Sequence, residues 1–347
     1  ANAFRKCPNL AMYPPDHRMY REKSRMLMEY LRTFTKEIEQ VSVDECYMNF
    51  TQIADRYHSP VDGAAEIKDG IKERFGFTVN VGISTNKLLA KMASDFQKPD
   101  RIHTLFPEEI QVKMWPLPIG ELYMAGRSSV EVLKKLEINT IGDLAKSDPA
   151  LITLHLKSHG RMLWEFANGH GTDIVQAEPE EAKGIGNSTT LREDAETIEE
   201  VRPVFEELAL SVGRRLKKAG KKAGMVSAEI KYYDFRALSH QAQLEKPSND
   251  PQVLKEAACS LFHEVWSGEP VRLLGIRTSK LVDESEPEQM TLFEWEPPKE
   301  PDEKHKKLKK AMDELNARFG DGAVMKASLL KKPENVPRKR RTDQEDG

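Results

Sequence analysis

The sequence predicts an α+β protein built from more than one domain. The chain has 347 residues, which is more than a single compact domain usually holds. Short strand and helix patterns alternate in its N-terminal third, a helical region follows, and longer strands and helices come after that. No apolar run is long enough to cross a membrane, and three widely spaced cysteines indicate neither a zinc site nor a disulfide framework. A reducing cytoplasm is the simplest setting for such a chain, and we also expect a monomer.

The first predicted element is a helix that begins after Pro14-Pro15-Asp16. Two consecutive prolines favour a turn over a central strand, and the Asp16 side chain is suited to cap the free N–H groups of a following helix. Apolar residues then recur at helical spacing and predict the buried face. They are Leu27, Tyr30, Leu31, Phe34 and Ile38.

Two adjacent carboxylates stand out in the segment Ser42-Val43-Asp44-Glu45-Cys46-Tyr47-Met48-Asn49-Phe50, which predicts a β-hairpin. Neighbouring side chains of a regular strand point to opposite faces, so only a bend lets Asp44 and Glu45 face one site. Paired carboxylates on a rigid sheet edge suit Mg²⁺, which proteins hold by one or two carboxylates together with substrate phosphates. The alternative is a solvated acidic turn.

A helix is predicted to start at Ser59-Pro60, and a strand with alternating apolar residues is predicted at 77–84. Ser84 is predicted to cap the next helix. Lys98 follows that helix, and Pro99 ends it. The apolar stripe of the helix consists of Leu88, Leu89, Met92, Ala93 and Phe96.

Taken together, S-V-D-E-C-Y-M-N at 42–49 and V-G-I-S-x-N-K-L-L-A-K-M-A-S-D-x-x-K-P at 81–99 resemble the Y-family, UmuC-like translesion DNA polymerases. The resemblance implies a right-hand polymerase that extends primer-template DNA, damaged DNA included, from deoxynucleoside triphosphates. It implies that Asp44 and Glu45 are catalytic palm carboxylates holding two Mg²⁺ ions, which stabilise the attacking and leaving oxygens. It also implies that Lys98 binds the incoming triphosphate and neutralises its charge.

Members of this family carry a further metal-binding Asp on a strand before the hairpin, but here only Asp16 precedes it. Because Asp16 has the context of a helix cap, residues 1–108 resemble partial fingers and palm with the first strand missing. We therefore expect an N-terminally truncated polymerase whose own activity depends on the missing strand. The alternative is a non-catalytic DNA- and sliding-clamp-binding protein with a palm remnant.

Residues 109–176 resemble the helix-hairpin-helix thumb of these polymerases. Proline-rich Trp115-Pro116-Leu117-Pro118 marks the boundary. The resemblance assigns DNA binding to Gly126, Arg127 and Ser128, since glycine admits a phosphate close to the backbone and the next helix offers free N–H groups. The usual hairpin has two glycines, and here Ala125 stands in place of one. An ordinary turn in a helical core is the alternative.

Residues 177–186 are predicted to be a linker, and residues 187–332 resemble the little-finger domain that grips duplex DNA. Its first strand is predicted at 188–192, and the resemblance assigns DNA contacts there to Ser188, Thr189, Thr190 and Arg192. A capping box starts a helix at Thr197, and a second helix is predicted to begin at Asp250-Pro251. A last helix is predicted at 308–319 and a last strand at 323–329. A basic cluster at 214–222 either faces phosphates or is a solvated helix end. The net charge of −3 does not exclude DNA, because a local basic stripe is enough.

Residues 289–293 read Gln289-Met290-Thr291-Leu292-Phe293 and resemble the peptide by which bacterial polymerases hold the sliding clamp. An extended segment of this kind buries its apolar side chains in a partner's pocket. The resemblance assigns clamp binding to Gln289, Leu292 and Phe293. The alternative is that Leu292 and Phe293 fold back onto their own domain. Residues 333–347 are predicted to be a disordered tail.

Overall fold

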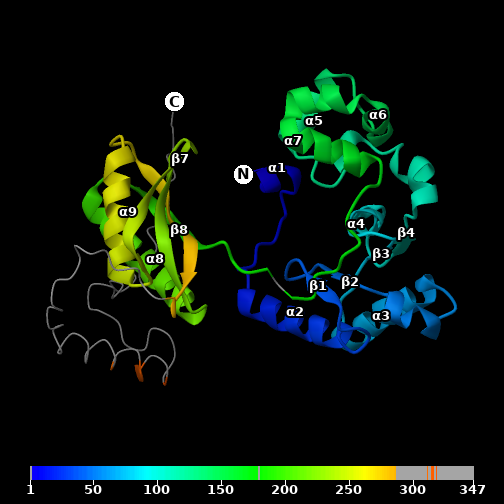
Figure 1. Ribbon diagram of the computed structural model, residues 1–347, viewed down its shortest axis with the longest axis horizontal. Coiled ribbons are helices and arrows are strands. Elements are labelled where there is room, and N and C mark those ends of the chain that lie inside the picture. The colour runs from blue at the N-terminus through cyan, green and yellow to red at the C-terminus, as the bar shows by residue number, and fades with distance from the viewer. Residues whose placement is uncertain (1, 179, 287–310, 312–313, 316–317, 319–347) are drawn as a thin grey trace, which may run out of the picture. The chain divides into compact units, whose positions relative to one another are not determined.

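The computed structural model describes residues 2–178 and 180–286, together with residues 311, 314, 315 and 318 (Figure 1). The chain forms two compact units, Ala1–Glu180 and Glu181–Gly347. The division between them falls inside the segment predicted to be a linker. None of the described helices is both long and apolar enough to span a lipid bilayer.

The N-terminal unit begins with α1 (Asn2–Lys6) and α2 (His17–Leu31). Asp16 caps α2 as predicted, because its carboxylate accepts hydrogen bonds from the N–H groups of Arg18 and Met19. The helix ends earlier than the apolar spacing predicted. The Thr33 hydroxyl donates to the Tyr30 carbonyl at 2.7 Å and competes for the last turn, so Phe34 lies beyond the helix and Ile38 lies in a strand.

The predicted hairpin is present. Strand β1 (Ile38–Gln40) pairs antiparallel with β2 (Cys46–Met48), and the turn between them carries Asp44 and Glu45. The short helix η1 (Thr51–Arg56) and α3 (Pro60–Phe75) follow, and Ser59 caps α3 as predicted. A small core lies between α2, α3 and the hairpin. It consists of Leu27, Met28, Leu31, Ile38, Ile67 and Ile71.

A second small sheet pairs β3 (Val81–Ile83) in parallel with β4 (Ile102–Thr104), and α4 (Lys87–Asp95) connects them. The strand is shorter than predicted, since its partner covers only these positions. The predicted cap was wrong. Asn86 caps α4 by accepting from the Leu89 N–H at 2.9 Å, whereas the Ser84 hydroxyl is turned toward the Leu105 carbonyl.

Gly82 allows α4 to pack directly on β3, because a Cβ built there would overlap the carbonyl oxygen of Ala90. Backbone atoms cannot move aside as a side chain can. We therefore expect Gly82→Ala to lower the free energy of unfolding by about 2–4 kcal/mol. Gly120→Ala is the matched control, since its Cβ would meet only Val130 at 3.9 Å. Thermal and urea unfolding measure both; equal midpoints for the two variants would contradict the close packing.

The rest of the N-terminal unit is helical. The short helices η2 (Pro107–Glu109), η3 (Ile110–Met114) and η4 (Ile119–Glu121) precede α5 (Arg127–Lys135), α6 (Ile141–Lys146) and α7 (Pro149–Ala167). One apolar core runs from α4 into these helices. The Trp115 indole fixes η3 against the end of α7 by donating to the Ala167 carbonyl at 3.0 Å.

The C-terminal unit is a four-stranded antiparallel sheet with two helices on one face (Figure 1). Its strands β5 (Gly184–Ala195), β6 (Lys221–Tyr232), β7 (Ala237–Ser248) and β8 (Val271–Asp283) have the order β5-β8-β6-β7. Helix α8 (Ile198–Lys218) packs on β5 and β8, and α9 (Pro251–Val265) on β6 and β7. Strand β5 is longer than predicted and begins inside the predicted linker. The final helix and strand predicted at 308–319 and 323–329 lie largely outside the described residues.

Candidate active site

The turn that carries the two carboxylates is organised by one hydroxyl. Ser42 Oγ accepts from the N–H groups of Asp44 and Glu45 at 3.3 and 3.1 Å and donates to Asp44 Oδ1 at 2.6 Å. The Glu45 carbonyl closes the turn by accepting from the Val41 N–H at 3.0 Å. The Asp44 side chain therefore projects from a hydrogen-bonded turn and not from a loose loop.

A chain of alternating charges joins this turn to the end of α4. Lys91 Nζ lies 2.6 Å from Glu45 Oε1 and 3.2 Å from Asp95 Oδ2. Asp95 Oδ1 in turn lies 2.7 Å from Lys98 Nζ. The structure thus brings two predicted site residues, Glu45 and Lys98, into one network, although about fifty residues separate them along the chain.

The network keeps its inner groups charged. Burial alone would lower the pKa of Lys91, but hydrogen bonds to Glu45 and Asp95 raise it above its usual value. Burial alone would raise the pKa of Asp95, but Lys98 and Lys91 hold it below its usual value. At neutral pH, Lys91 is therefore a fixed cation between two carboxylates.

A second ion pair links the hairpin to the start of α4. Lys87 at the start of α4 lies 2.7 Å from Glu39 on β1. Burial would raise the pKa of Glu39, yet the hydrogen bonds from Lys87 and from the Gln176 N–H lower it. The Lys87 ammonium also lies 5.5 Å from the centre of the Tyr47 ring. Burial, above all, raises the pKa of Tyr47 to about 12, so this phenol stays neutral.

Two carboxylates on one turn form a donor set of hard oxygen atoms, which fits Mg²⁺ better than a softer metal. Within the described part of the chain, no three His, Cys, Asp or Glu side chains converge as a metal cage would require. Asp44 and Glu45 currently engage different partners, Ser42 and Lys91. A cation bound here would have to take Glu45 from Lys91 and fill its coordination from substrate oxygens.

The predicted thumb residues lie in a separate element. Gly126 is the N-cap of α5, and a Cβ built on it would meet no atom within 4 Å. The Arg127 side chain is 94% exposed and pairs with Glu131 at 3.1 Å. The turn therefore presents the first N–H groups of α5, including that of Ser128, to open space.

The predicted DNA-binding residues of β5 divide between two faces. Asn187 donates to Ser211 on α8 at 3.2 Å, which places Asn187 on the helix-covered face with the buried Ile185. Because side chains alternate along a strand, Thr189 shares that face, whereas Ser188 and Thr190 point to the opposite face. Arg192 follows a register break between Thr190 and Ala195. Gln289, Leu292 and Phe293 lie outside the described residues.

Sequence reasoning missed Ser42, Lys91 and Asp95 as members of the site. The i, i+4 spacing of Lys91 and Asp95 was visible within the 81–99 block, and such a pair shares one helix face. Nothing local to that block, however, showed that the pair would reach Glu45.

Comparison with known proteins places the chain among polymerases. The model of the impB/mucB/samB family matches residues 1–95, and that of its C-terminal domain matches residues 182–292. A protein named DNA polymerase IV from Clostridium acetobutylicum is 41% identical over 333 residues, which are 96% of this chain and 83% of that protein. Another DNA polymerase IV, from Bacillus velezensis, is 36% identical over 97% of this chain and 80% of its own length.

The fold has a solved counterpart as well. A Y-family DNA polymerase chimera superposes with a TM-score of 0.70 at 22% sequence identity, covering 81% of this chain and 82% of its own. At that identity the likeness concerns the fold, and it agrees with the mixture of helices and strands described above.

Proposed function

Because the chain belongs to the impB/mucB/samB family, the Y family of DNA polymerases, we propose that it extends primers on damaged templates and that the β1–β2 turn is its reaction centre. The observation that carries the proposal is the chain of charges from Glu45 through Lys91 and Asp95 to Lys98. It joins Glu45, one of the two turn carboxylates suited to a metal, to a cation suited to a triphosphate. No observation favours the non-catalytic alternative.

Asp44 and Glu45 are the residues that would hold Mg²⁺. When bound, Mg²⁺ stabilises the attacking and leaving oxygens of nucleotidyl transfer. The protein's own part is positioning. Ser42 holds the turn, and Lys91 keeps the turn against α4. Lys98 is 60% exposed, so its ammonium is accessible to the phosphates of an incoming nucleotide.

Lys98 supports triphosphate binding through charge. We expect Lys98→Gln to raise the KM for deoxynucleoside triphosphates about tenfold, since one charge-assisted contact to phosphate is lost. Steady-state primer extension with Mg²⁺, by protein in which the expected palm strand precedes residue 1, measures this and also tests the proposed activity itself. Such a protein that never extends a primer would contradict the proposed function.

Lys72→Gln is a matched control for Lys98→Gln. The Lys72 side chain is 56% exposed and pairs with Asp100 at 2.7 Å, much as Lys98 pairs with Asp95. An equal rise in KM for both variants would show that the effect comes from lost surface charge and not from a triphosphate contact at Lys98.

DNA binding is proposed at two places, each described within its own unit. In the N-terminal unit, the exposed first turn of α5 suits a phosphate, with Gly126, Arg127 and Ser128 as its contacts. In the C-terminal unit, Ser188, Thr190 and Arg192 suit the sugar-phosphate backbone from the sheet face opposite the helices. Thr189 is not placed for that face.

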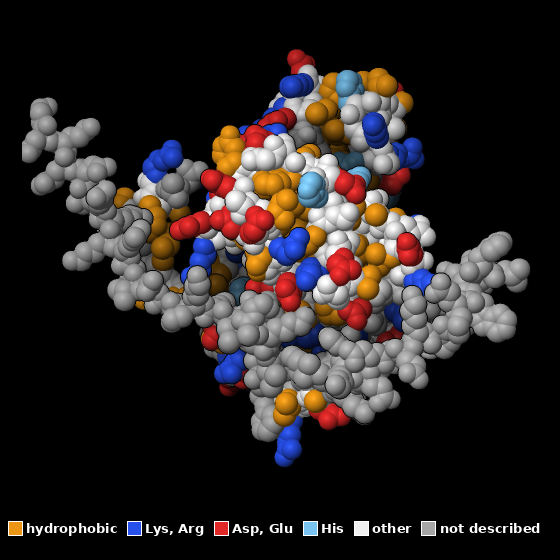
Figure 2. Space-filling model, turned by 90° about the vertical axis from the view of Figure 1, so that its left-hand side faces the viewer, with side chains coloured by type: hydrophobic (Ala, Val, Ile, Leu, Met, Phe, Trp, Pro, Cys, Tyr) orange, Lys and Arg blue, Asp and Glu red, His pale blue; other side chains and the backbone are white. Residues whose placement is uncertain are grey.

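The predicted basic cluster is partly engaged within the protein. Arg215 donates to the Gly186 carbonyl at 2.6 Å. Lys221 lies between Asp283 at 2.9 Å and Glu181 at 3.2 Å. On the face that Figure 2 presents, cationic and anionic side chains lie among one another and neither sign covers the face alone. Arg215 thus links α8 to β5, and Lys221 links β6 to β8, so neither is counted among the proposed phosphate contacts.

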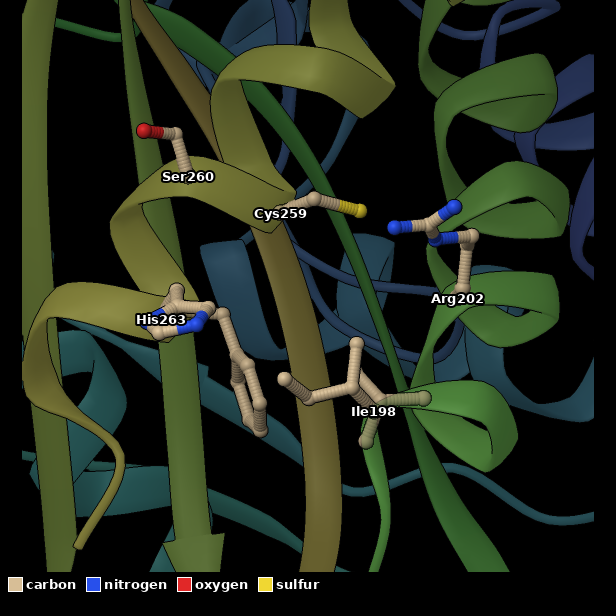
Figure 3. A pocket seen from close by; sticks show the side chains of 7 residues that line it. Ile198, Arg202, Cys259, Ser260 and His263 are labelled. Atoms are coloured by element: carbon tan, nitrogen blue, oxygen red, sulfur yellow. The ribbon is translucent and has the colours of Figure 1, made fainter.

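Binding of the sliding clamp through Gln289, Leu292 and Phe293 stays a proposal from the sequence. An apolar hollow of about 290 Å³ lies between α8 and α9 (Figure 3). Under the alternative that Leu292 and Phe293 fold back onto their own domain, it is a candidate site for their side chains. It lies at the start of α8, beside Ile198 and Arg202. The chain leaves β8 at the other end of α8, where the Glu284 N–H donates to the Gly220 carbonyl at 2.8 Å.

A further inference from the structure

The C-terminal sheet presents a face that no described residue of its own unit covers. Val226, Ala228 and Ile230 of β6 are buried under the helices, so Glu229 and Lys231 point the other way. Register continues this alternation across the sheet, where Ser188, Gly275, Glu229 and Ser239 are successive partners on β5, β8, β6 and β7. Most side chains on this face are small or uncharged, which allows close approach of another backbone.

The centre of this face is hollowed to a volume of about 280 Å³, with Ser188, Glu229 and Arg277 in its lining. Gly186 also lines this hollow. Gly275 lies between Ser188 and Glu229, which are its partners on the two neighbouring strands. A Cβ built at Gly275 would lie 3.1 Å from the Ser188 Cβ and 3.2 Å from Glu229 Oε2. The Glu229 carboxylate therefore lies over the glycine, at the middle of the face.

Glu229 places a carboxylate on the sheet face that is proposed to contact DNA phosphates. Among the residues that the structure describes, none gives its carboxylate a hydrogen bond or an ion pair. The nearest cations on the same face are Lys231, two positions along β6, and Arg277, diagonal to Glu229 on β8. Both spacings correspond to about 7 Å between backbone positions. The carboxylate thus opposes the field of both cations without being bound by either.

We propose that Glu229 limits the affinity of this face for the phosphate backbone of primer-template DNA. This inference rests on the proposed function, because it takes DNA as the partner of the face. A phosphate held by Arg277 or Lys231 comes close to the carboxylate, and like charges repel more strongly once DNA displaces water. The carboxylate thereby favours dissociation of the enzyme from DNA after short synthesis.

Glu229→Gln removes the charge and keeps the shape. We expect it to tighten binding of a fluorescently labelled primer-template about fivefold at low ionic strength, with a gain that shrinks as salt screens the phosphates. Glu207→Gln is the control, because Glu207 is exposed on α8, which covers the opposite sheet face. Fluorescence anisotropy gives the affinities, and thermal melting checks that all variants keep the fold.

Arg277→Ala separates failure of this inference from failure of the proposed function. If Arg277→Ala weakens binding and Glu229→Gln strengthens it, the proposal stands. If Arg277→Ala weakens binding while Glu229→Gln leaves it unchanged or weaker, the face binds DNA but Glu229 does not limit affinity. If neither variant changes affinity, this face is not the DNA contact, and both the inference and that part of the proposed function are overturned.

Discussion

A protein with both Asp44→Ala and Glu45→Ala is expected to lose at least about a thousandfold of its primer-extension rate, because the metal ions then lack their carboxylates from the turn. DNA affinity is expected to stay within about twofold of wild type, since the proposed DNA contacts lie on other elements. Single-turnover extension with Mg²⁺ and anisotropy titration measure the two quantities on the same preparations, in which the expected palm strand precedes residue 1.

The double variant should fold, which makes the test interpretable. Lys91 keeps Asp95 as a partner at 3.2 Å when Glu45 is lost, and both changed residues are exposed in the turn. Asp55→Ala, an exposed carboxylate on the neighbouring η1, is the control. Extension by the double variant at a tenth of the wild-type rate or better would remove Asp44 and Glu45 from the reaction centre.

Changing Leu292 and Phe293 together to Ala is expected to weaken binding to a sliding clamp about a hundredfold, because two apolar anchors leave the partner's pocket. The melting temperature should stay the same, since neither side chain is proposed to belong to the core. Calorimetry with purified clamp and thermal melting measure both halves.

Leu315→Ala is the matched control for the clamp variant, as Leu315 is a leucine that is 41% exposed outside the 289–293 segment. It should leave clamp affinity unchanged. A large fall in melting temperature for the Leu292 and Phe293 variant, with clamp binding retained, would show instead that these two side chains are core residues. Truncating buried apolar side chains typically costs several kcal/mol.

The start of a helix was predicted well where a single capping residue determines it. Asp16, Ser59, Thr197 and Asp250 each precede a helix and cap it in the structure, because their short side chains reach free N–H groups. Ser84 failed as a cap because Asn86, two residues later, competes for the same role. The spacing of apolar residues predicted that α2 continues past Leu31, but the helix ends there and the backbone turns.

The site was predictable in its parts and not in its connections. The hairpin and its two carboxylates follow from a local pattern, and Lys98 followed from the resemblance. The ion pair between Lys91 and Glu45 joins elements that are distant along the chain, so no local periodicity contains it. The position of Thr189 also depends on contacts between distant elements. Its side chain faces α8, and the pattern of residues in β5 alone does not show on which side of the strand that helix packs.

A crystal structure of the protein with primer-template DNA, a non-hydrolysable deoxynucleoside triphosphate and Mn²⁺ in place of Mg²⁺ tests the central claim most directly. Anomalous scattering locates the metal independently of any assumption about its ligands. We predict a Mn²⁺ peak at coordinating distance from a carboxylate oxygen of Asp44 or Glu45, with Lys98 Nζ at the triphosphate. A metal–triphosphate complex bound elsewhere, with Glu45 still paired to Lys91, would contradict the account.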